Sequence, residues 1–238
     1  MSAGSGTTRA MEAAPRVLRD ITGGLVVSCQ APVGSPLRDP AIVALIAQAA
    51  ILGGAVGLRV NGPDDVAAVR AITALPIIGL HKVRGEHRNL ITPGVELARG
   101  LLKAGADMIA VDGTAEVGAL VPDLIPAVIA ELGCPVMADI ATYDEGIAAH
   151  DAGAHVVGTT LSGYTVATMD GIEAPDLALI RRLAERGVPV IAEGRYRSPG
   201  QVAAAFEAGA LAVVVGGAIT DPLSTTQRFA AATPRMSG

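Results

Sequence analysis

The stretch LLKAGADMIAVDG (101–113) contains the unit that decides the fold: a helix end, a glycine turn and a short apolar strand. Gly105 can adopt the left-handed backbone conformation in which many helices end. The run MIAVDG after it is almost continuously apolar, which is typical of a strand covered on both faces of a parallel sheet. The unit therefore predicts a helix that returns the chain to a buried parallel strand.

The same unit recurs along the chain. Further Gly-Ala steps occur at 54–55, 153–154 and 209–210, and each leads into a β-branched run. The eight predicted strands are LVVSCQ (25–30), AVGLRV (55–60), PIIGLHK (76–82), MIAVDG (108–113), PVMADI (135–140), VVGTT (156–160), PVIAEG (189–194) and AVVVGGAI (212–219). Eight strands that alternate with helices favour a closed (β/α)8 TIM barrel. A doubly wound open sheet is the alternative, but no G-x-G-x-x-G motif follows the first strand.

The composition limits the domain organisation and the class of partner. The chain of 238 residues is 50% hydrophobic and has a formal net charge of −5. We expect one barrel domain over residues 21–232, with tails over 1–20 and 233–238. The negative charge disfavours nucleic acid as a partner, and no uninterrupted apolar run is long enough to cross a membrane. Two cysteines do not make a disulfide framework, and the first residues lack the apolar middle of a signal peptide, so we expect a cytoplasmic protein.

Polar side chains follow the apolar part of most predicted strands. In barrels of this kind the C-terminal strand ends carry the active site. Because side chains alternate between the faces of a strand, Lys82 shares a face with the apolar residues before it, as does Glu193. The polar residues at these ends are Gln30, Arg59, Lys82, Asp112, Asp139, Thr159, Thr160 and Glu193. We expect them at the mouth of the barrel, with Gln30 and Thr159 among the substrate contacts.

The chemistry that such a set supports is proton transfer. No Cys or Ser pairs with a His base, and the four histidines do not have the spacing of a metal site. A partly buried lysine loses hydration, so its pKa moves toward neutrality and the amine can act as a base. Lys82 and Glu193 lie on the third and seventh predicted strands, and both could therefore reach one substrate atom across the barrel. Arg59 and Asp139 could orient polar groups around that atom.

Glycines at the ends of the last two strands suggest a phosphate site. Gly216 and Gly217 follow the eighth strand, and Gly194 and Arg195 follow the seventh. Glycine lets the backbone approach a ligand closely. The loops after strands seven and eight bind phosphate in many such barrels. We therefore expect a phosphorylated substrate.

At these residues the sequence resembles the N-acetylmannosamine-6-phosphate 2-epimerase family. The motifs that carry the resemblance include SCQA (28–31), VGTTLSGYT (157–165), PVIAEGRYRSPGQ (189–201) and AVVVGGAIT (212–220). The family inverts C2 of an acetamido-sugar phosphate without an added cofactor. The resemblance implies Lys82 and Glu193 as the catalytic pair, and Gln30, Arg59, Asp139, Gly194, Gly216 and Gly217 as substrate contacts. It also implies a homodimer, for which the helix expected near 225–232 offers a contact.

Three departures from the family pattern concern charge near the substrate. Val83-Arg84 stands where an acidic-aromatic pair is usual, VDGTAEV (111–117) has Glu116 and no arginine, and Asp221-Pro222 replaces Arg-Pro. Arg195 or Arg197 could compensate, or the substrate could differ. Two alternatives therefore stay open: another sugar-phosphate isomerase or epimerase on the same barrel, and a non-catalytic sugar-phosphate sensor.

Overall fold

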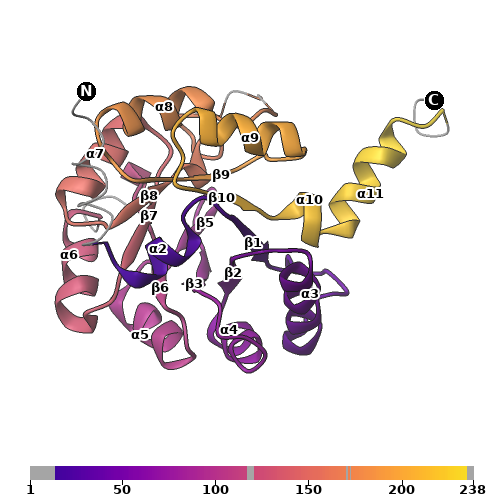
Figure 1. The fold of residues 1–238 in the computed structure, drawn as a ribbon, viewed down its shortest axis with the longest axis horizontal. Coiled ribbons are helices and arrows are strands. Elements are labelled where there is room, and N and C mark those ends of the chain that lie inside the picture. The colour runs from indigo at the N-terminus through magenta and orange to yellow at the C-terminus, as the bar shows by residue number, and fades with distance from the viewer. Residues whose placement is uncertain (1–13, 117–120, 170, 172, 235–238) are drawn as a thin grey trace.

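Eight parallel strands form a closed barrel (Figure 1). The computed structural model describes residues 14–116, 121–169, 171 and 173–234. Around the barrel the strands follow the order β1-β10-β9-β8-β7-β6-β3-β2. They are β1 (Leu25–Cys29), β2 (Gly57–Asn61), β3 (Ile77–Leu80), β6 (Met108–Asp112), β7 (Val136–Asp139), β8 (Val156–Gly158), β9 (Val190–Glu193) and β10 (Ala212–Val215). The predicted (β/α)8 barrel is confirmed.

Helices cover the outside of the ring between consecutive barrel strands. They are α3 (Pro40–Leu52), α4 (Pro63–Arg70), α5 (Val95–Lys103), α6 (Val121–Leu132), α7 (Tyr143–Asp151), α8 (Leu177–Glu185) and α9 (Pro199–Glu207). Side chains that accept hydrogen bonds from free backbone N–H groups define where several begin. Thr142 and Glu145 form a capping box at α7, and Ser198 and Gln201 form one at α9.

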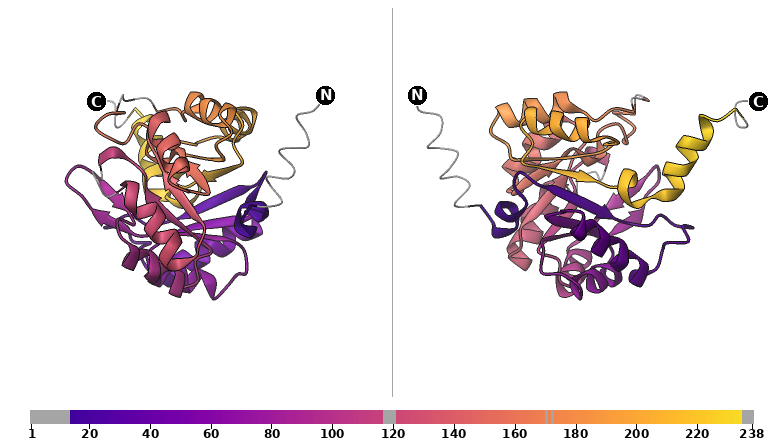
Figure 2. Two further views of the ribbon diagram at one scale, coloured as in Figure 1. Left: turned by 90° about the vertical axis from the view of Figure 1, so that its left-hand side faces the viewer. Right: turned by 45° about the vertical axis from the view of Figure 1, so that its right-hand side comes forward.

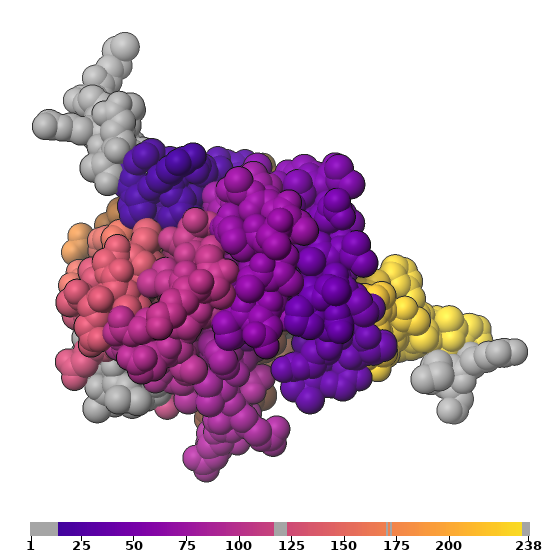
Figure 3. Space-filling view, turned by 90° about the horizontal axis from the view of Figure 1, so that it is seen from below, coloured from indigo at the N-terminus to yellow at the C-terminus, as the bar shows by residue number. Residues whose placement is uncertain are grey.

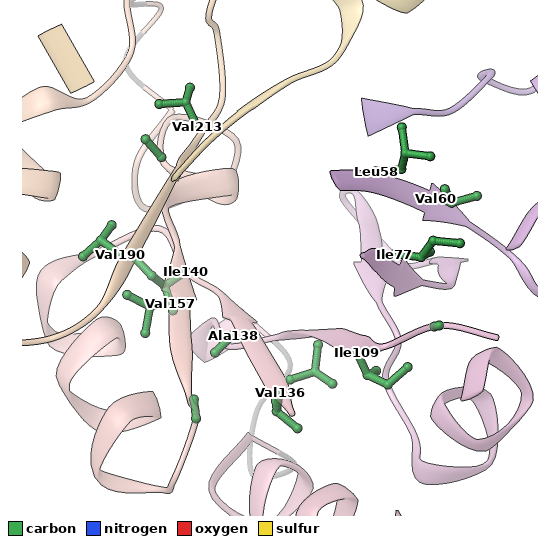
Figure 4. Close-up of a cluster of buried hydrophobic side chains, with 14 of the residues drawn as sticks. Leu58, Val60, Ile77, Ile109, Val136, Ala138, Ile140, Val157, Val190 and Val213 are labelled. Atoms are coloured by element: carbon green, nitrogen blue, oxygen red, sulfur yellow. The ribbon is translucent and has the colours of Figure 1, made fainter. Parts of the chain in front are cut away.

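Two apolar layers result from the alternation of side chains along the strands. Outward-facing residues pack against the helices, and ten of them are labelled in Figure 4. Inward-facing residues such as Ile78, Met137 and Ile191 fill the barrel itself. The short helix α2 (Arg16–Ile21) closes the barrel at the N-terminal ends of the strands, because its Leu18 and Ile21 are buried with the inward-facing residues. The barrel is therefore a packed core that α2 closes at one end.

Three predicted boundaries are wrong. The tail expected over 1–20 ends earlier, because α2 begins at Arg16; residues 1–13 of it, and 235–238 of the expected C-terminal tail, lie outside the described residues. The third strand ends at Leu80, and Lys82 begins a separate antiparallel hairpin of β4 (Lys82–Arg84) and β5 (Asn89–Ile91). The eighth strand ends at Val215 and gives way to α10 (Gly217–Thr220), because the Thr220 backbone N–H donates to the Gly216 carbonyl at 3.0 Å and closes a helical turn, while the Thr220 hydroxyl donates to the Ser28 carbonyl at 2.8 Å.

The last helix, α11 (Pro222–Ala231), does not pack on the barrel. The chain leaves the ring after β10, between α9 and α3, and α11 points away from the body of the molecule (Figures 1 and 2). None of its residues is buried, and Phe229 is 75% exposed. In the space-filling view the C-terminal segment extends beyond the rest of the surface (Figure 3). Among the described residues, none therefore buries a side chain of α11, the eighth helix of the barrel pattern.

Candidate active site

A cavity of about 1230 Å³ opens at the C-terminal ends of the strands. Its lining comes from the segments that follow β1, β3, β8, β9 and β10 and from one face of α11. The predicted site residues that line it are Gln30, Lys82, Glu193, Gly194, Arg195, Gly216 and Gly217. Seven residues from four separate segments of the sequence are therefore brought to one cavity.

The floor below the cavity is a buried cluster of charges. Arg59 is 1% exposed and forms ion pairs with both Asp139 and Glu193. Thr160 joins the same cluster, because its hydroxyl lies 2.7 Å from Asp139 Oδ1 and 3.2 Å from Glu193 Oε2. One cation between two carboxylates leaves a net negative charge, and burial strengthens each of these interactions. The cluster holds the Glu193 carboxylate in place at the bottom of the cavity.

A glycine in β8 makes room for this cluster. A Cβ atom added at Gly158 would overlap Met137 Cε, and it would lie 3.0 Å from Asp139 Oδ1 and 3.1 Å from Thr160 Oγ1. All three distances are tighter than ordinary van der Waals contact, so a larger residue would displace the methionine, the carboxylate and the hydroxyl. The position is glycine because the Met137 side chain and the polar floor both approach the backbone closely.

Lys82 stands on the other side of the cavity. The strands that precede Lys82 and contain Glu193, β3 and β9, lie opposite each other in the closed ring. The Lys82 backbone N–H donates to Asn61 Oδ1 at 2.8 Å, which ties the start of the hairpin to the end of β2. Among the described residues no carboxylate lies within ion-pair distance of the Lys82 ammonium. The amine and the Glu193 carboxylate therefore face one space from two sides without contacting each other.

The surroundings shift the protonation of two site residues. Loss of hydration lowers the pKa of Lys82 from its ordinary value, and the nearby Arg59 charge lowers it further, while Glu193 and Asp139 oppose the shift. Burial raises the pKa of the Asp139 carboxyl to about 6; the Arg59 charge opposes this rise and the Glu193 charge adds to it. Lys82 is exposed at the cavity surface, yet the walls around it displace much of the water that would stabilise its charge.

The hairpin that carries Lys82 is held by an arginine that sequence reasoning missed. The Arg88 guanidinium donates to both Asp112 oxygens, at 2.6 and 3.0 Å, and to Glu116 at 2.7 Å. Asp112 also accepts from the Ile91 backbone N–H at 3.2 Å. The polar residues of the VDGTAEV segment are thus engaged with the hairpin. Because the hairpin itself was not predicted, no sequence signal connected Arg88 with Asp112.

Three of the predicted substrate contacts do not reach the cavity lining. Arg59 and Asp139 are buried beneath Glu193, and their polar groups point to the charge cluster. Thr159 is 2% exposed, and its hydroxyl donates to the Glu193 carbonyl at 2.9 Å and accepts from the Glu193 N–H at 3.1 Å. Its neighbour Thr160 lines the cavity in its place. A 3₁₀ turn over Thr159–Leu161 follows β8, which turns the second threonine inward.

The turn after β9 depends on two residues with positive φ. Gly194 has φ 109° and Arg195 has φ 63°. The first angle strains any residue with a side chain, which accounts for glycine there. The Arg195 guanidinium lies 6.0 Å from the centre of the Tyr164 ring, from the loop after β8. The two loops are therefore joined where they face the cavity.

The rest of the described chain narrows the chemistry. Within it, no group of three or more His, Cys, Asp or Glu side chains could hold a metal ion. No described helix is long and apolar enough to cross a membrane. Cys29 and Cys134 are buried and unpaired with each other, and burial raises the pKa of the Cys29 thiol to about 12. Neither cysteine lines the cavity.

Comparisons with known sequences point to one family. A family model described as "Putative N-acetylmannosamine-6-phosphate epimerase" matches residues 43–235. The chain is 43% identical over 225 residues to a protein of Caldanaerobacter subterraneus subsp. tengcongensis, covering 90% of this chain and 92% of that one. It is 49% identical over 202 residues to a protein of Yersinia pseudotuberculosis, covering 84% and 85%. Both relatives are named "Putative N-acetylmannosamine-6-phosphate 2-epimerase".

Solved structures agree with this result. The N-acetylmannosamine-6-phosphate 2-epimerase from Clostridium perfringens superimposes with a TM-score of 0.84 at 39% identity, covering 91% of this chain and 96% of that chain. The thiamine phosphate pyrophosphorylase from Pyrococcus furiosus superimposes with a TM-score of 0.60 at 15% identity, covering 88% and 93%. The second similarity concerns the fold alone.

Proposed function

The chain belongs to the N-acetylmannosamine-6-phosphate 2-epimerase family and is an isomerase, and we propose that it interconverts N-acetylmannosamine 6-phosphate and N-acetylglucosamine 6-phosphate with Lys82 and Glu193 as its two acid–base groups. The observation that supports this assignment is the placement of an amine just after β3 and a carboxylate at the end of β9, two strands on opposite sides of the ring, so that both groups line one cavity. Inversion at carbon needs proton removal on one face and proton delivery on the other. Two groups on opposite walls meet that need.

The reaction begins with the open-chain sugar, whose aldehyde makes the C2 proton acidic. Lys82 removes this proton as a free amine, which its lowered pKa makes available. The electron pair moves into the C1 carbonyl and gives an enediolate-type intermediate. Glu193, in its protonated form, then delivers a proton to the opposite face of C2. In the reverse direction the two groups exchange roles.

The buried charges beneath the cavity orient the carboxylate. Arg59 and Thr160 bind Glu193 Oε2, so that the other oxygen can turn toward the substrate. Asp139 in turn holds Arg59. We therefore assign Arg59, Asp139 and Thr160 as positioning residues for Glu193. Gln30 has a buried Oε1 without a hydrogen-bond partner in the structure, which suits acceptance of a bond from a substrate hydroxyl or amide.

Deuterium incorporation tests the reaction. Wild-type enzyme in D2O, supplied with N-acetylmannosamine 6-phosphate, should give N-acetylglucosamine 6-phosphate with one deuterium at C2, detected by NMR and mass spectrometry. Product that forms without deuterium at C2 would contradict proton transfer with solvent-exchanging groups. A sugar-phosphate sensor would give no product at all.

A homodimer is the proposed assembly, and α11 provides its contact. Leu223 and Phe229 of α11 are exposed. Helix α3 next to the exit point of the chain contains Gln48 as its only polar residue, and its Leu45 and Leu52 are 64% and 84% exposed. Exposed apolar surface of this kind is typical of a subunit contact. Light scattering should give a dimer for the wild type and a monomer for Phe229→Asp; a monomeric wild type would contradict the proposal.

A cytoplasmic location is supported by the substrate and by the two cysteines. A sugar phosphate is charged and does not pass through a lipid bilayer unaided. Both cysteines are buried free thiols, as is usual for proteins of a reducing compartment. Fractionation of the host cells should recover the activity with the cytoplasmic enzymes.

A further inference from the structure

Seven positively charged side chains line the cavity, and they differ in whether a carboxylate neutralises them. They are Arg38, Lys82, Arg84, Arg88, Arg195, Arg197 and Arg228. Arg88 is paired with Asp112 and Glu116, and Arg197 with Glu173. Among the described residues, Arg38, Lys82, Arg84 and Arg228 have no carboxylate within ion-pair distance. A substrate phosphate carries about two negative charges, and a cation without a carboxylate partner is available to bind it.

Arg228 is placed beside the two glycines after β10 by consecutive hydrogen bonds. Its Nη2 donates to Thr225 Oγ1 at 3.0 Å. The Thr225 hydroxyl in turn donates to the Gly217 carbonyl at 3.0 Å. Although α11 points away from the barrel, its first turns therefore bring one arginine back to the start of α10. The guanidinium uses one N–H in this contact and retains others for a ligand.

The backbone next to Arg228 is open to a ligand. The nearest atom to a Cβ added at Gly217 would be the Asp221 Cβ, at 3.9 Å. The Asp221 carboxylate is engaged with its own helix, because it accepts from the Ser224 backbone N–H at 3.1 Å and from the Ser224 hydroxyl at 2.5 Å. The acidic residue at this point is thus a helix cap, which reduces its repulsion of an anion.

We propose that Arg228 is the side chain that binds the substrate phosphate, together with the Gly216–Gly217 backbone, and that Thr225 positions it. The inference rests on the proposed function and adds a residue that determines specificity for phosphorylated over unphosphorylated sugar. Arginine suits this role because its planar guanidinium donates two parallel hydrogen bonds to phosphate oxygens. Its role is to bind the substrate, and the proton transfers are assigned to Lys82 and Glu193.

Kinetics with two sugars test the assignment. Arg228→Gln should raise KM for N-acetylmannosamine 6-phosphate about 10- to 100-fold and change kcat less than about twofold, because a charge-assisted bond is lost in binding. Its kcat/KM for unphosphorylated N-acetylmannosamine should equal that of the wild type. Thr225→Val should raise the same KM by a smaller factor, and Arg228→Lys should restore part of the loss. Arg181→Gln, an exposed arginine on α8 outside the cavity, is the matched control and should change nothing.

Inorganic phosphate separates this inference from the proposed function, because its binding needs no turnover. By calorimetry the wild type should bind phosphate and Arg228→Gln should bind it at least about tenfold more weakly, with an unchanged melting temperature. Equal affinity in the two proteins, or a loss in Arg84→Gln but not in Arg228→Gln, would overturn the assignment of Arg228. Phosphate binding that depends on Arg228, in a wild type that turns over neither sugar, would refute the epimerase and keep the anion site.

Discussion

The two walls of the cavity hold their acid–base groups in different ways. Glu193 belongs to a barrel strand, is fixed by Arg59 and Thr160, and rests on a floor whose charges are almost fully buried. Lys82 belongs to a hairpin outside the barrel and is exposed. Its position depends on contacts between Arg88, in the same hairpin, and Asp112 at the end of β6. The wall that carries Glu193 is therefore part of the rigid barrel, whereas the wall that carries Lys82 is attached to the barrel by a few polar contacts.

The largest expected effect comes from removing the amine itself. Lys82→Ala should lower kcat about 100- to 10,000-fold, the usual contribution of one general base, while binding of inorganic phosphate persists. The chain contains one other lysine, Lys103 on the exposed side of α5, and Lys103→Ala is the matched control. Steady-state kinetics on both variants measure the effect. A Lys82→Ala enzyme with near wild-type kcat would remove the hairpin from the mechanism.

Removing the cation from the floor should affect stability as well as rate. Arg59→Met leaves Asp139 buried without its counter-charge, and we expect the free energy of unfolding to fall by about 3–5 kcal/mol. Urea denaturation followed by circular dichroism measures this change. An equally stable variant would show that the floor does not depend on the ion pairs. The double variant Arg59→Met with Asp139→Leu should recover part of the stability, because the fully buried Asp139 charge is removed and only the more exposed Glu193 keeps its charge there.

A smaller effect is expected from loosening the other wall. Arg88→Ala should reduce kcat about 10- to 100-fold, because Lys82 loses its position while its amine is retained. The loss of stability should be smaller than for Arg59→Met, since the hairpin lies outside the barrel. Arg84→Gln on the same hairpin, which has no carboxylate partner among the described residues, should have a weaker effect on kcat. The two walls would be equivalent if Arg88→Ala unfolded the protein as readily as Arg59→Met does.

The smallest effect concerns pH. Because the pKa of Lys82 is lowered, its free amine forms at lower pH than that of an ordinary lysine, and Lys82 should react faster than Lys103 with an amine acylating reagent near pH 8. Mass spectrometry of the two labelled peptides measures the ratio within one sample. For Asp139, with its pKa raised to about 6, the carboxylate is charged above that pH and protonated below it. Activity should therefore decline as pH falls through about 6, and a flat profile between pH 5 and 7 would contradict this role.

The sequence predicts the barrel better than it predicts the two walls. Buried strands are specified locally by apolar runs and glycine turns, so all eight could be found. The ends of the third and eighth strands could not be predicted. Lys82 continues the parity of β3 although the ladder stops at Leu80, and the hairpin that follows is held to β6 by Arg88 and Asp112, which are 24 residues apart in sequence. Thr159 and Thr160 look equivalent in sequence, and only the 3₁₀ turn after β8 decides which hydroxyl reaches the cavity.

The central claim, that Lys82 and Glu193 serve opposite faces of one carbon, is tested most directly by hydrogen exchange without inversion. In D2O, Glu193→Gln should exchange the C2 proton of N-acetylmannosamine 6-phosphate while forming almost no epimer, because Lys82 can remove and return hydrogen on its own face. Lys82→Ala should give the complementary result with N-acetylglucosamine 6-phosphate. Inversion at a near wild-type rate in either variant, or loss of exchange with both sugars in Glu193→Gln, would contradict the two-sided account.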